Sequence, residues 1–334
     1  MKTVRVSVVV PVLLPFPREG IDWLCCGTHR QLLGLSNRVA LDREGRIPLT
    51  FRWLTTSATK KLRTDFFRFR HVRKFKVLEI SFHIPHRASK YRVVLDDDEC
   101  GHPDFVSEVA SDVSLFLRTL TLSTNIARPG SMEFDRPVMF IEDEGPVRLP
   151  GMCNSLSIIF TFGKKLDWPE IRLLRLTKVW NWIKKIDDVW VAFGSSPIGR
   201  ALAAFSHLHP EEWGYESPLN DLWSVIGLEA IYQSNGHQRE LVQKACLFLG
   251  THHKGKPTIE EAYRSRSGLI HGGVDFPFSY CEFDALPQFE RWINRSLKLQ
   301  DNSVPIFVAT LQQMAARNIY SIEFEYKLKK TRAK

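Results

Sequence analysis

The chain has 334 residues, of which 44% are hydrophobic and 25% charged, the balance of an ordinary globular protein. This length allows two domains, and no stretch is biased enough in composition to predict disorder. No apolar run reaches the 18 residues or more that a membrane-spanning helix needs, so we expect no membrane partner. The net charge of +9 favours a polyanionic partner, nucleic acid first, although a solvated basic surface explains it equally well.

The amino-terminal segment MKTVRVSVVVPVLLPFP combines a lysine with an apolar run, the beginning of a signal-peptide pattern. Arg5 and Ser7 interrupt the run, valine dominates it, and no small-residue cleavage site follows, so a first β-strand is the better interpretation. The six cysteines include no C-x-x-C pair and no His/Cys group at zinc-ligand spacing. We therefore expect reduced thiols, a cytoplasmic location, and no metal or cofactor.

The first half of the chain, residues 1–163, is predicted to be a mixed α+β domain with more strand than helix. Short runs of β-branched and aromatic residues alternate there with loops that contain Pro, Gly and Asp. The predicted strands are residues 3–13, 47–54, 76–84, 91–95, 138–141 and 156–162. One helix is predicted within residues 104–122, because apolar side chains recur there at helical spacing.

From about Gly163 the pattern becomes helical, which predicts an all-α domain over residues 164–318 and a basic tail over 319–334. Asp167 and Glu170 form a capping-box pattern that predicts the start of a helix there. Further helices are predicted at residues 197–207, from Ser217-Pro218 with Leu219, Leu222, Ile226 and Ala230 inward, from Asn235-Gly236 to Leu249, and around 286–299 and 304–317. The fold class we expect is therefore α+β, with strands early and a helical bundle late.

The most informative stretch is PTIEEAYRSRSGLIHGG, residues 257–273. Thr258 and Glu261 form a capping box that predicts the start of a helix. Gly272 and Gly273 supply the left-handed residue that ends one. The stretch therefore predicts a well-delimited helix with arginines and a histidine in its last turns.

An arginine followed at short helical spacing by a histidine means little by itself. About two or three such pairs are expected by chance in a chain of this composition, the risk that any short motif carries. Three occur, namely Arg200/His207, Arg264/His271 and Arg266/His271. Without further context, such a pair near a helix end is usually a solvated face or a helix cap.

The flanking sequence supplies that context. RSGLIHG, which begins at Arg266, resembles the R-S-x-x-x-H-G core of the Apea-like branch of the HEPN superfamily. LWSVIGLEAI, residues 222–231, is similar to the "ALEAL" helix of that branch, and residues 243–249 resemble the helix that follows. The likeness covers residues 219–273 clearly and 166–317 more loosely. Gly268 and Gly227 depart from the family pattern, and a glycine inside a helix costs about 1 kcal/mol relative to alanine.

The resemblance implies RNA cleavage without a metal or cofactor, by a homodimer that brings two such helices over a shared cleft. It also implies a defence or toxin effector of a prokaryotic cytoplasm, with tRNA as one candidate substrate. Histidine suits proton transfer near neutral pH, and the guanidinium of arginine binds phosphate oxygens in a bidentate manner. We expect His271 to handle the proton and Arg266 to stabilise the pentavalent phosphate, which gives 2′,3′-cyclic phosphate and 5′-hydroxyl ends.

Three other residues belong to the predicted site. Arg264 is the second choice for the cation, because an ideal helix places it about 20° from His271, against about 140° for Arg266. Ser267 is a candidate hydrogen-bond donor to phosphate, and Glu229 either orients an arginine or forms a plain structural salt bridge. The alternative functions are a non-catalytic HEPN module for RNA binding or dimerisation, and a regulatory protein that binds an acidic partner.

Residues 60–76, KKLRTDFFRFRHVRKFK, hold eight basic side chains against one acidic one, with phenylalanines between them. Basic side chains can follow the phosphates of a nucleic-acid strand while aromatic rings stack on its bases. An edge strand with its phenylalanines inward explains the same pattern. The predicted nucleic-acid contacts are Lys60, Lys61, Arg63, Arg68, Arg70, Arg73, Lys74 and Lys76.

Overall fold

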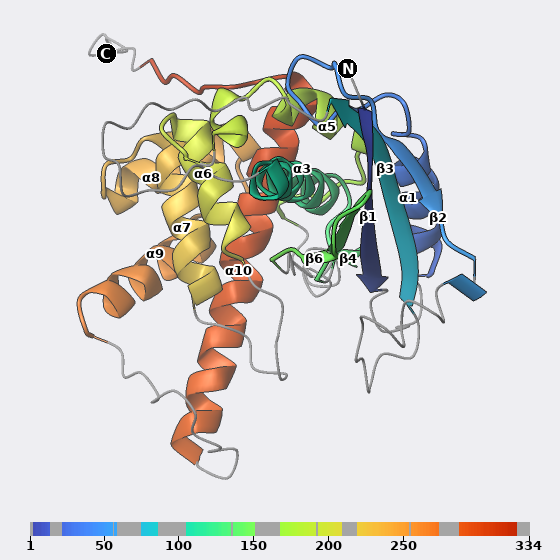
Figure 1. The fold of residues 1–334 in the computed structure, drawn as a ribbon. Coiled ribbons are helices and arrows are strands. Elements are labelled where there is room, and N and C mark those ends of the chain that lie inside the picture. Colours follow the sequence, from blue (N-terminus) through green and yellow to red (C-terminus); the bar gives the residue numbers. More distant parts are fainter. Residues whose placement is uncertain are drawn as a thin grey trace, which may run out of the picture.

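The computed structural model describes residues 3–13, 22–55, 57–58, 75–85, 105–134, 136–150, 168–191, 193–208, 219–253, 255–273 and 287–325. The described part combines one antiparallel sheet from the first half of the chain with helices that dominate the second half. Figure 1 shows the sheet on one side, α6 to α9 on the other, and α3 and α10 between them. This arrangement confirms the predicted α+β class.

The sheet is built around its longest strands. β1 (Thr3–Leu13) pairs with β3 (Phe75–Pro85) along its whole length. The strand order is β2-β3-β1-β5-β6, with β4 also paired to β1, and the remaining bounds are β2 Thr50–Trp53, β4 Glu133–Phe134, β5 Val138–Ile141 and β6 Val147–Arg148. The described strands confirm the predictions at 3–13, 76–84 and 138–141, and β2 confirms only residues 50–53 of the strand predicted at 47–54. The strands predicted at 91–95 and 156–162 lie outside the described residues.

Valine explains why β1 is the central strand. The even-numbered valines from Val4 to Val12 join the main core on one face of the sheet. Val9 packs with Val77 and Val138 in a smaller apolar cluster of its own. Successive side chains of a strand point to opposite faces, so a strand with apolar residues at successive positions is covered on both faces and lies inside a sheet.

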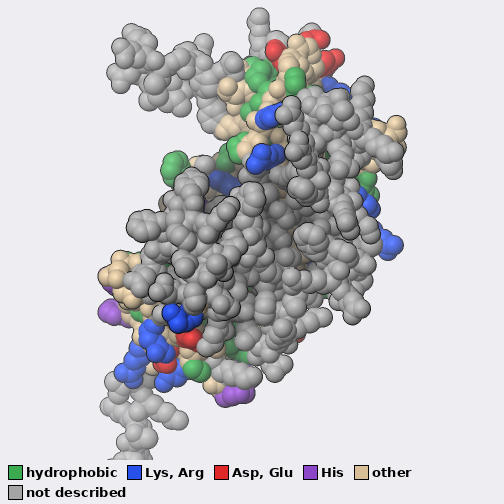
Figure 2. Space-filling view, turned by 90° about the horizontal axis from the view of Figure 1, so that it is seen from below, with side chains coloured by type: hydrophobic (Ala, Val, Ile, Leu, Met, Phe, Trp, Pro, Cys, Tyr) green, Lys and Arg blue, Asp and Glu red, His purple; other side chains and the backbone are tan. Residues whose placement is uncertain are grey.

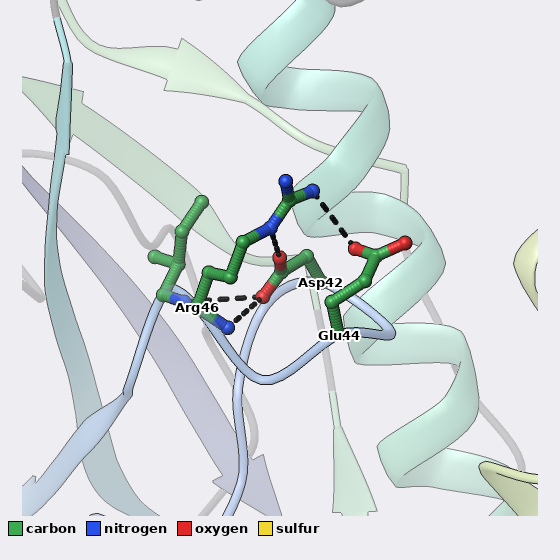
Figure 3. A network of polar contacts seen from close by, with 4 residues as sticks. Asp42, Glu44 and Arg46 are labelled. Atoms are coloured by element: carbon green, nitrogen blue, oxygen red, sulfur yellow. Dashed lines mark hydrogen bonds and ion pairs between the residues drawn. The ribbon is translucent and has the colours of Figure 1, made fainter.

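Two helices accompany the sheet. α1 (Asp22–Leu33) was not predicted, and α3 (Phe105–Ala127) confirms the helix predicted within 104–122 and extends it. Between α1 and β2, the carboxylate of Asp42 accepts hydrogen bonds from the backbone N–H groups of Arg46 and Ile47, at 2.9 and 3.1 Å. The Arg46 guanidinium bonds both Asp42 and Glu44, which closes this turn (Figure 3).

The second half of the chain forms the helical side of the molecule. Its elements are α5 Leu176–Ile183, the 3-10 turn η1 Asp187–Trp190, α6 Pro197–Ser206, α7 Leu219–Tyr232, α8 Gln238–Leu249, α9 Gly255–Ile270 and α10 Pro287–Arg317. α6 confirms the helix predicted at 197–207. α8 ends at Gly250, whose φ of 93° suits glycine, as the sequence predicted.

The helix start predicted from the Asp167/Glu170 capping box is wrong, since α5 begins only at Leu176. Residues 168–175 are not helical, because their backbone bonds to distant parts of the chain. The N–H of Arg172 donates to Gln312 Oε1 at 2.8 Å, and that of Leu174 donates to the carbonyl of Ala127 at 2.9 Å. Tertiary hydrogen bonds thus replace the local cap here.

The Thr258/Glu261 capping box also misplaces a helix start. α9 begins at Gly255, four residues before the first helical residue that a cap at Thr258 predicts, and Pro257 is accommodated in its first turn. Gly255 packs against Trp168, where an added Cβ would lie 3.1 Å from the indole ring. This contact fixes the first turn of α9 in a way that the local sequence does not reveal.

α10 is one helix of 31 residues, so the prediction of two separate helices is wrong. Pro305 lies inside α10 and lacks the N–H of a helical hydrogen bond, a loss of about 3 kcal/mol or more. The residues that follow it are deeply buried, including Ile306, Phe307 and Leu311. Their packing offsets the local cost and carries the helix through the proline.

The predicted inward face of α7 is only partly right. The structure buries Asp221, Ser224, Val225 and Leu228 most deeply. Of the residues predicted inward, Leu219 is exposed, whereas Ile226 and Ala230 are partly buried against the core. α7 is apolar on most sides, so periodicity does not select a face. Gly227 determines which face of α7 packs against α10. A Cβ added at Gly227 would lie 2.1 Å from Phe307 Cζ, so only glycine allows this contact.

A single hydrophobic cluster runs through the described residues from Val4 to Ala315 and includes both sheet and helices. Gln312 of α10 joins the two halves of the chain, since its amide donates to the carbonyls of Ile126 and Arg172 at 2.8 and 2.7 Å. The division into 1–163, 164–318 and 319–334 stays a prediction. In the described part of the chain, no helix has the length and apolar character to cross a membrane.

Candidate active site

The candidate site lies where the last turns of α9 pack against α7. Arg266 of α9 forms an ion pair with Glu229 of α7, with 3.0 Å between Nη2 and Oε2. The two side chains are only 20% and 13% exposed. Arg266 Nε and Glu229 Oε1 are buried and have no hydrogen-bond partner among the described residues. The pair therefore keeps unused hydrogen-bonding capacity beneath the surface.

The electrostatics of this pair follow from its burial. Burial raises the pKa of Glu229, and the positive charge of Arg266 opposes the rise. The guanidinium carbon of Arg266 also lies 5.8 Å from the ring of Tyr263, one turn earlier on α9, a cation–π distance. Arg266 is thus oriented both by a carboxylate and by an aromatic ring, and Tyr263 is a contact that the sequence analysis missed.

His271 follows the last residue of α9 and is exposed. Its backbone N–H donates to the carbonyl of Ser267 at 3.0 Å, and Gly273 N–H donates to Gly268 O at 2.8 Å. With Gly272 at φ 71°, this is the predicted glycine ending of the helix. The ending fixes the backbone that carries the imidazole, while the ring itself meets solvent.

The predicted residues occupy two sides of α9. Arg266 faces α7, with no described contact to His271. Arg264 is exposed, and its Nε donates to the carbonyl of Glu260 at 3.2 Å. Seven residues along a helix return to nearly the same side, so Arg264 lies on the side of His271. The half-buried Ser267 has its carbonyl engaged by His271.

A buried polar cluster that the sequence analysis missed lies between α7, α9 and α10. It consists of Asp221, Ser224, Ser265 and Ser303, all at most 6% exposed. Burial raises the pKa of Asp221 to about 6; the hydroxyls of Ser303 and Ser265 oppose that rise and the nearby Glu261 adds to it. Neither Asp221 oxygen has a well-formed hydrogen bond among the described residues. The available signal was Asp221 and Ser224, one turn apart in a mostly apolar helix.

Of the predicted nucleic-acid contacts, the structure describes Lys76 alone, at the exposed start of β3. Lys76 Nζ lies 3.5 Å from His29 Nδ1 and 5.9 Å from the ring centre of Trp53. Burial, and then Lys76, lower the pKa of His29 to about 4. The contacts outside the described residues are Lys60, Lys61, Arg63, Arg68, Arg70, Arg73 and Lys74.

Figure 2 shows Lys and Arg side chains gathered near histidines on part of the face seen from below.

Across the ranges that the structure describes, no group of three or more His, Cys, Asp or Glu side chains is placed to hold a metal ion. No protein-family model matches the chain, and it has no match among curated proteins or solved structures.

Proposed function

We propose that the protein is a metal-independent endoribonuclease of the HEPN type. The observation that carries the proposal is the arrangement at the end of α9, where a guanidinium oriented by Glu229 lies five residues before an exposed imidazole. A cation held in place and a solvent-accessible proton carrier are the two groups that attack by the 2′-hydroxyl of RNA requires. His271 moves the proton and Arg266 stabilises the phosphate, which leaves 2′,3′-cyclic phosphate and 5′-hydroxyl ends.

The proposed enzyme is a homodimer. Within one subunit Arg266 faces α7 while His271 faces solvent, so a composite site needs a second copy of α9. One exposed apolar side chain supports an interface beside the site: Ile270, next to His271, is 48% exposed. Single exposed apolar residues are common on protein surfaces, so the argument for the dimer rests on the separation of Arg266 from His271 within one subunit.

The proposed biological role is that of a defence or toxin effector in a prokaryotic cytoplasm, with tRNA as one candidate substrate. The basic run 60–76 selects the RNA in this proposal. Its last basic residue, Lys76, lies beside the ring of Trp53, a pairing that suits a phosphate next to a stacked base.

The test is cleavage of total RNA by the full-length protein in EDTA. We expect His271→Ala and Arg266→Ala each to lower the cleavage rate by about 100-fold or more, the usual range for a lost proton-transfer group or charge stabiliser. His253→Ala is the matched control, because His253 is exposed in the loop before α9. Mapping of the RNA ends checks for the cyclic phosphate. Undiminished cleavage by both variants would assign the activity to a contaminant.

A second candidate function is a non-catalytic HEPN module that binds RNA or dimerises within a larger complex. The observation that favours it is the ion pair itself, because Glu229 holds Arg266 on the α7 side, away from His271. Tight RNA binding by the wild-type protein without cleavage would select this function.

A further inference from the structure

A pocket of about 240 Å³ lies between α3, η1 and α6, apart from the α9 site. Arg118 of α3 and Val189 of η1 line one part of it. Phe193, Leu202 and His207 line another, from the segment before α6 to its end. This volume is near the lower end for small-molecule sites, which suits a ligand the size of one substituted ring.

Arg118 is the charged group of this pocket. It is half-buried, and its Nη2 donates to the carbonyl of Val189 at 2.8 Å. Within the described ranges, no carboxylate forms an ion pair with it. Burial lowers the pKa of Arg118, a sign that its charge is poorly solvated. Partial burial of a charged guanidinium without a counter-ion costs desolvation free energy, and a bound anion would offset that cost.

Asp188 also lines the pocket, but its charge is already engaged. One oxygen accepts from the backbone N–H and the hydroxyl of Ser195, at 3.1 and 2.6 Å. The other accepts from the N–H of Ser196 at 3.0 Å and from its hydroxyl. Burial alone would raise the pKa of Asp188, and these four hydrogen bonds lower it to about 2. The carboxylate therefore serves the start of α6, and among the described residues it forms no ion pair with Arg118.

Apolar side chains make up much of the remaining wall. Leu122 and Leu202 are buried, whereas Phe193 is 80% exposed, although an aromatic side chain is usually covered. Gly194 lets the chain pass close to α6, since an added Cβ there would lie 2.5 Å from Gly199. An exposed ring at the edge of an apolar pocket offers a stacking surface for a flat ligand.

We propose that this pocket binds a small organic anion, with its phosphate or carboxylate group on Arg118 and its flat apolar body against Phe193 and Leu202. The site is separate from Arg266 and His271, so the proposal does not depend on the proposed nuclease activity. The α6 side of the pocket leads to α7, because the ring of His207 stacks on Trp223 at 4.4 Å. A bound anion therefore lies one helix away from the element that carries Glu229.

The test is isothermal titration calorimetry of the full-length protein with three probes of matched shape. Phenyl phosphate and benzoate each carry an anionic group on a ring, whereas benzamide is a neutral analogue of benzoate. We expect at least one anion to bind at least tenfold more tightly than benzamide. The preference between phenyl phosphate and benzoate identifies the anionic group. Equal binding of all three probes, or no binding of either anion, overturns the proposal.

Variants assign the binding to the pocket. Arg118→Met should lower the affinity for the preferred anion at least tenfold while the melting temperature of the ligand-free protein stays the same or rises. Arg118→Lys keeps the charge without the planar fork and should bind with intermediate affinity. Arg175→Met makes the same change at an exposed arginine outside the pocket and should bind like wild type. Wild-type affinity in both Arg118 variants overturns the proposal.

Discussion

Two buried carboxylates in the helical half of the chain differ in almost everything except their burial. Asp188 accepts four hydrogen bonds at the start of α6, and its pKa falls to about 2. Asp221 lies among α7, α9 and α10 with no well-formed hydrogen bond in the described part, and its pKa rises to about 6. Burial disfavours the charge of both, so hydrogen bonds decide which of them stays ionised.

The comparison separates two uses of a buried acid. Asp188 organises the backbone, because its donors include the N–H groups of Ser195 and Ser196, the two residues just before α6. Among the described residues Asp221 bonds no backbone group, and it lies beneath the turn of α9 that carries Ser265 and Arg266. The first region should therefore respond strongly to any change of shape, and the second to a change of pH.

Gly199→Ala should have the largest effect. The added Cβ would lie 1.9 Å from Asp188 Oδ2 and would push the carboxylate off its donors. We expect a loss of about 4 kcal/mol in the free energy of unfolding, from broken charged hydrogen bonds and overpacking. Urea denaturation measures it, with Gly145→Ala as the control because nothing lies within 4 Å of that Cβ. A loss below about 1 kcal/mol would mean that Asp188 moves freely.

Asp221→Asn should have the next largest effect, and it depends on pH. The folded protein keeps the proton of Asp221 up to about pH 6, whereas the unfolded chain loses it near pH 3.8. The stabilisation is therefore complete below pH 3.8 and is lost as the pH rises to 6, by about 3 kcal/mol in all. Unfolding at pH 4 to 7 should show this slope in wild type and not in the variant.

The exposed Asp187 provides the control for this titration. Asp187→Asn keeps the buried acid and should keep the slope between pH 4 and 6. An Asp221→Asn variant whose stability still falls over this range would show that another group titrates there.

Ser196→Ala should have the smallest effect. The Ser196 hydroxyl caps α6 by accepting from Gly199 N–H at 3.0 Å, and it also bonds Asp188. Loss of such a cap costs about 1 kcal/mol. Thermal unfolding measures the change, and Ser206→Ala at the other end of α6 should cost less, because its hydroxyl bonds only a carbonyl of its own helix. Equal losses would mean that the Asp188 network adds nothing to the cap.

The sequence predicted elements whose cause is local. The strand β1 follows from its own run of valines. The ends of α9 at Gly272, with φ 71°, and of α8 at Gly250 follow from the glycines at those positions. It failed where distant groups decide. The start of α5 depends on Gln312, and the buried face of α7 depends on Phe307. Neither contact leaves a periodic pattern in its own segment.

The candidate site divides in the same way. The structure pairs Glu229 with Arg266 of the neighbouring helix α9, an ion pair that fits both predicted roles of Glu229, the orientation of an arginine and a plain structural salt bridge. The sequence also placed His271 at a glycine-terminated helix end. It gave no sign of the buried Asp221 or of the half-buried Arg118, because burial of a polar side chain depends on helices that are far apart in the chain.

Gln312 has a practical consequence for anyone who wishes to express the two halves separately. Its side-chain amide donates to the carbonyl of Ile126 in the first half of the chain and to the carbonyl of Arg172 in the second half. A fragment that starts near residue 164 would expose to water the side of α10 that faces the core. A fragment that ends near residue 164 would keep α3 but would lose the helices that cover it. Co-expression of both pieces, with recovery tested by reassembly, is the route that this geometry recommends.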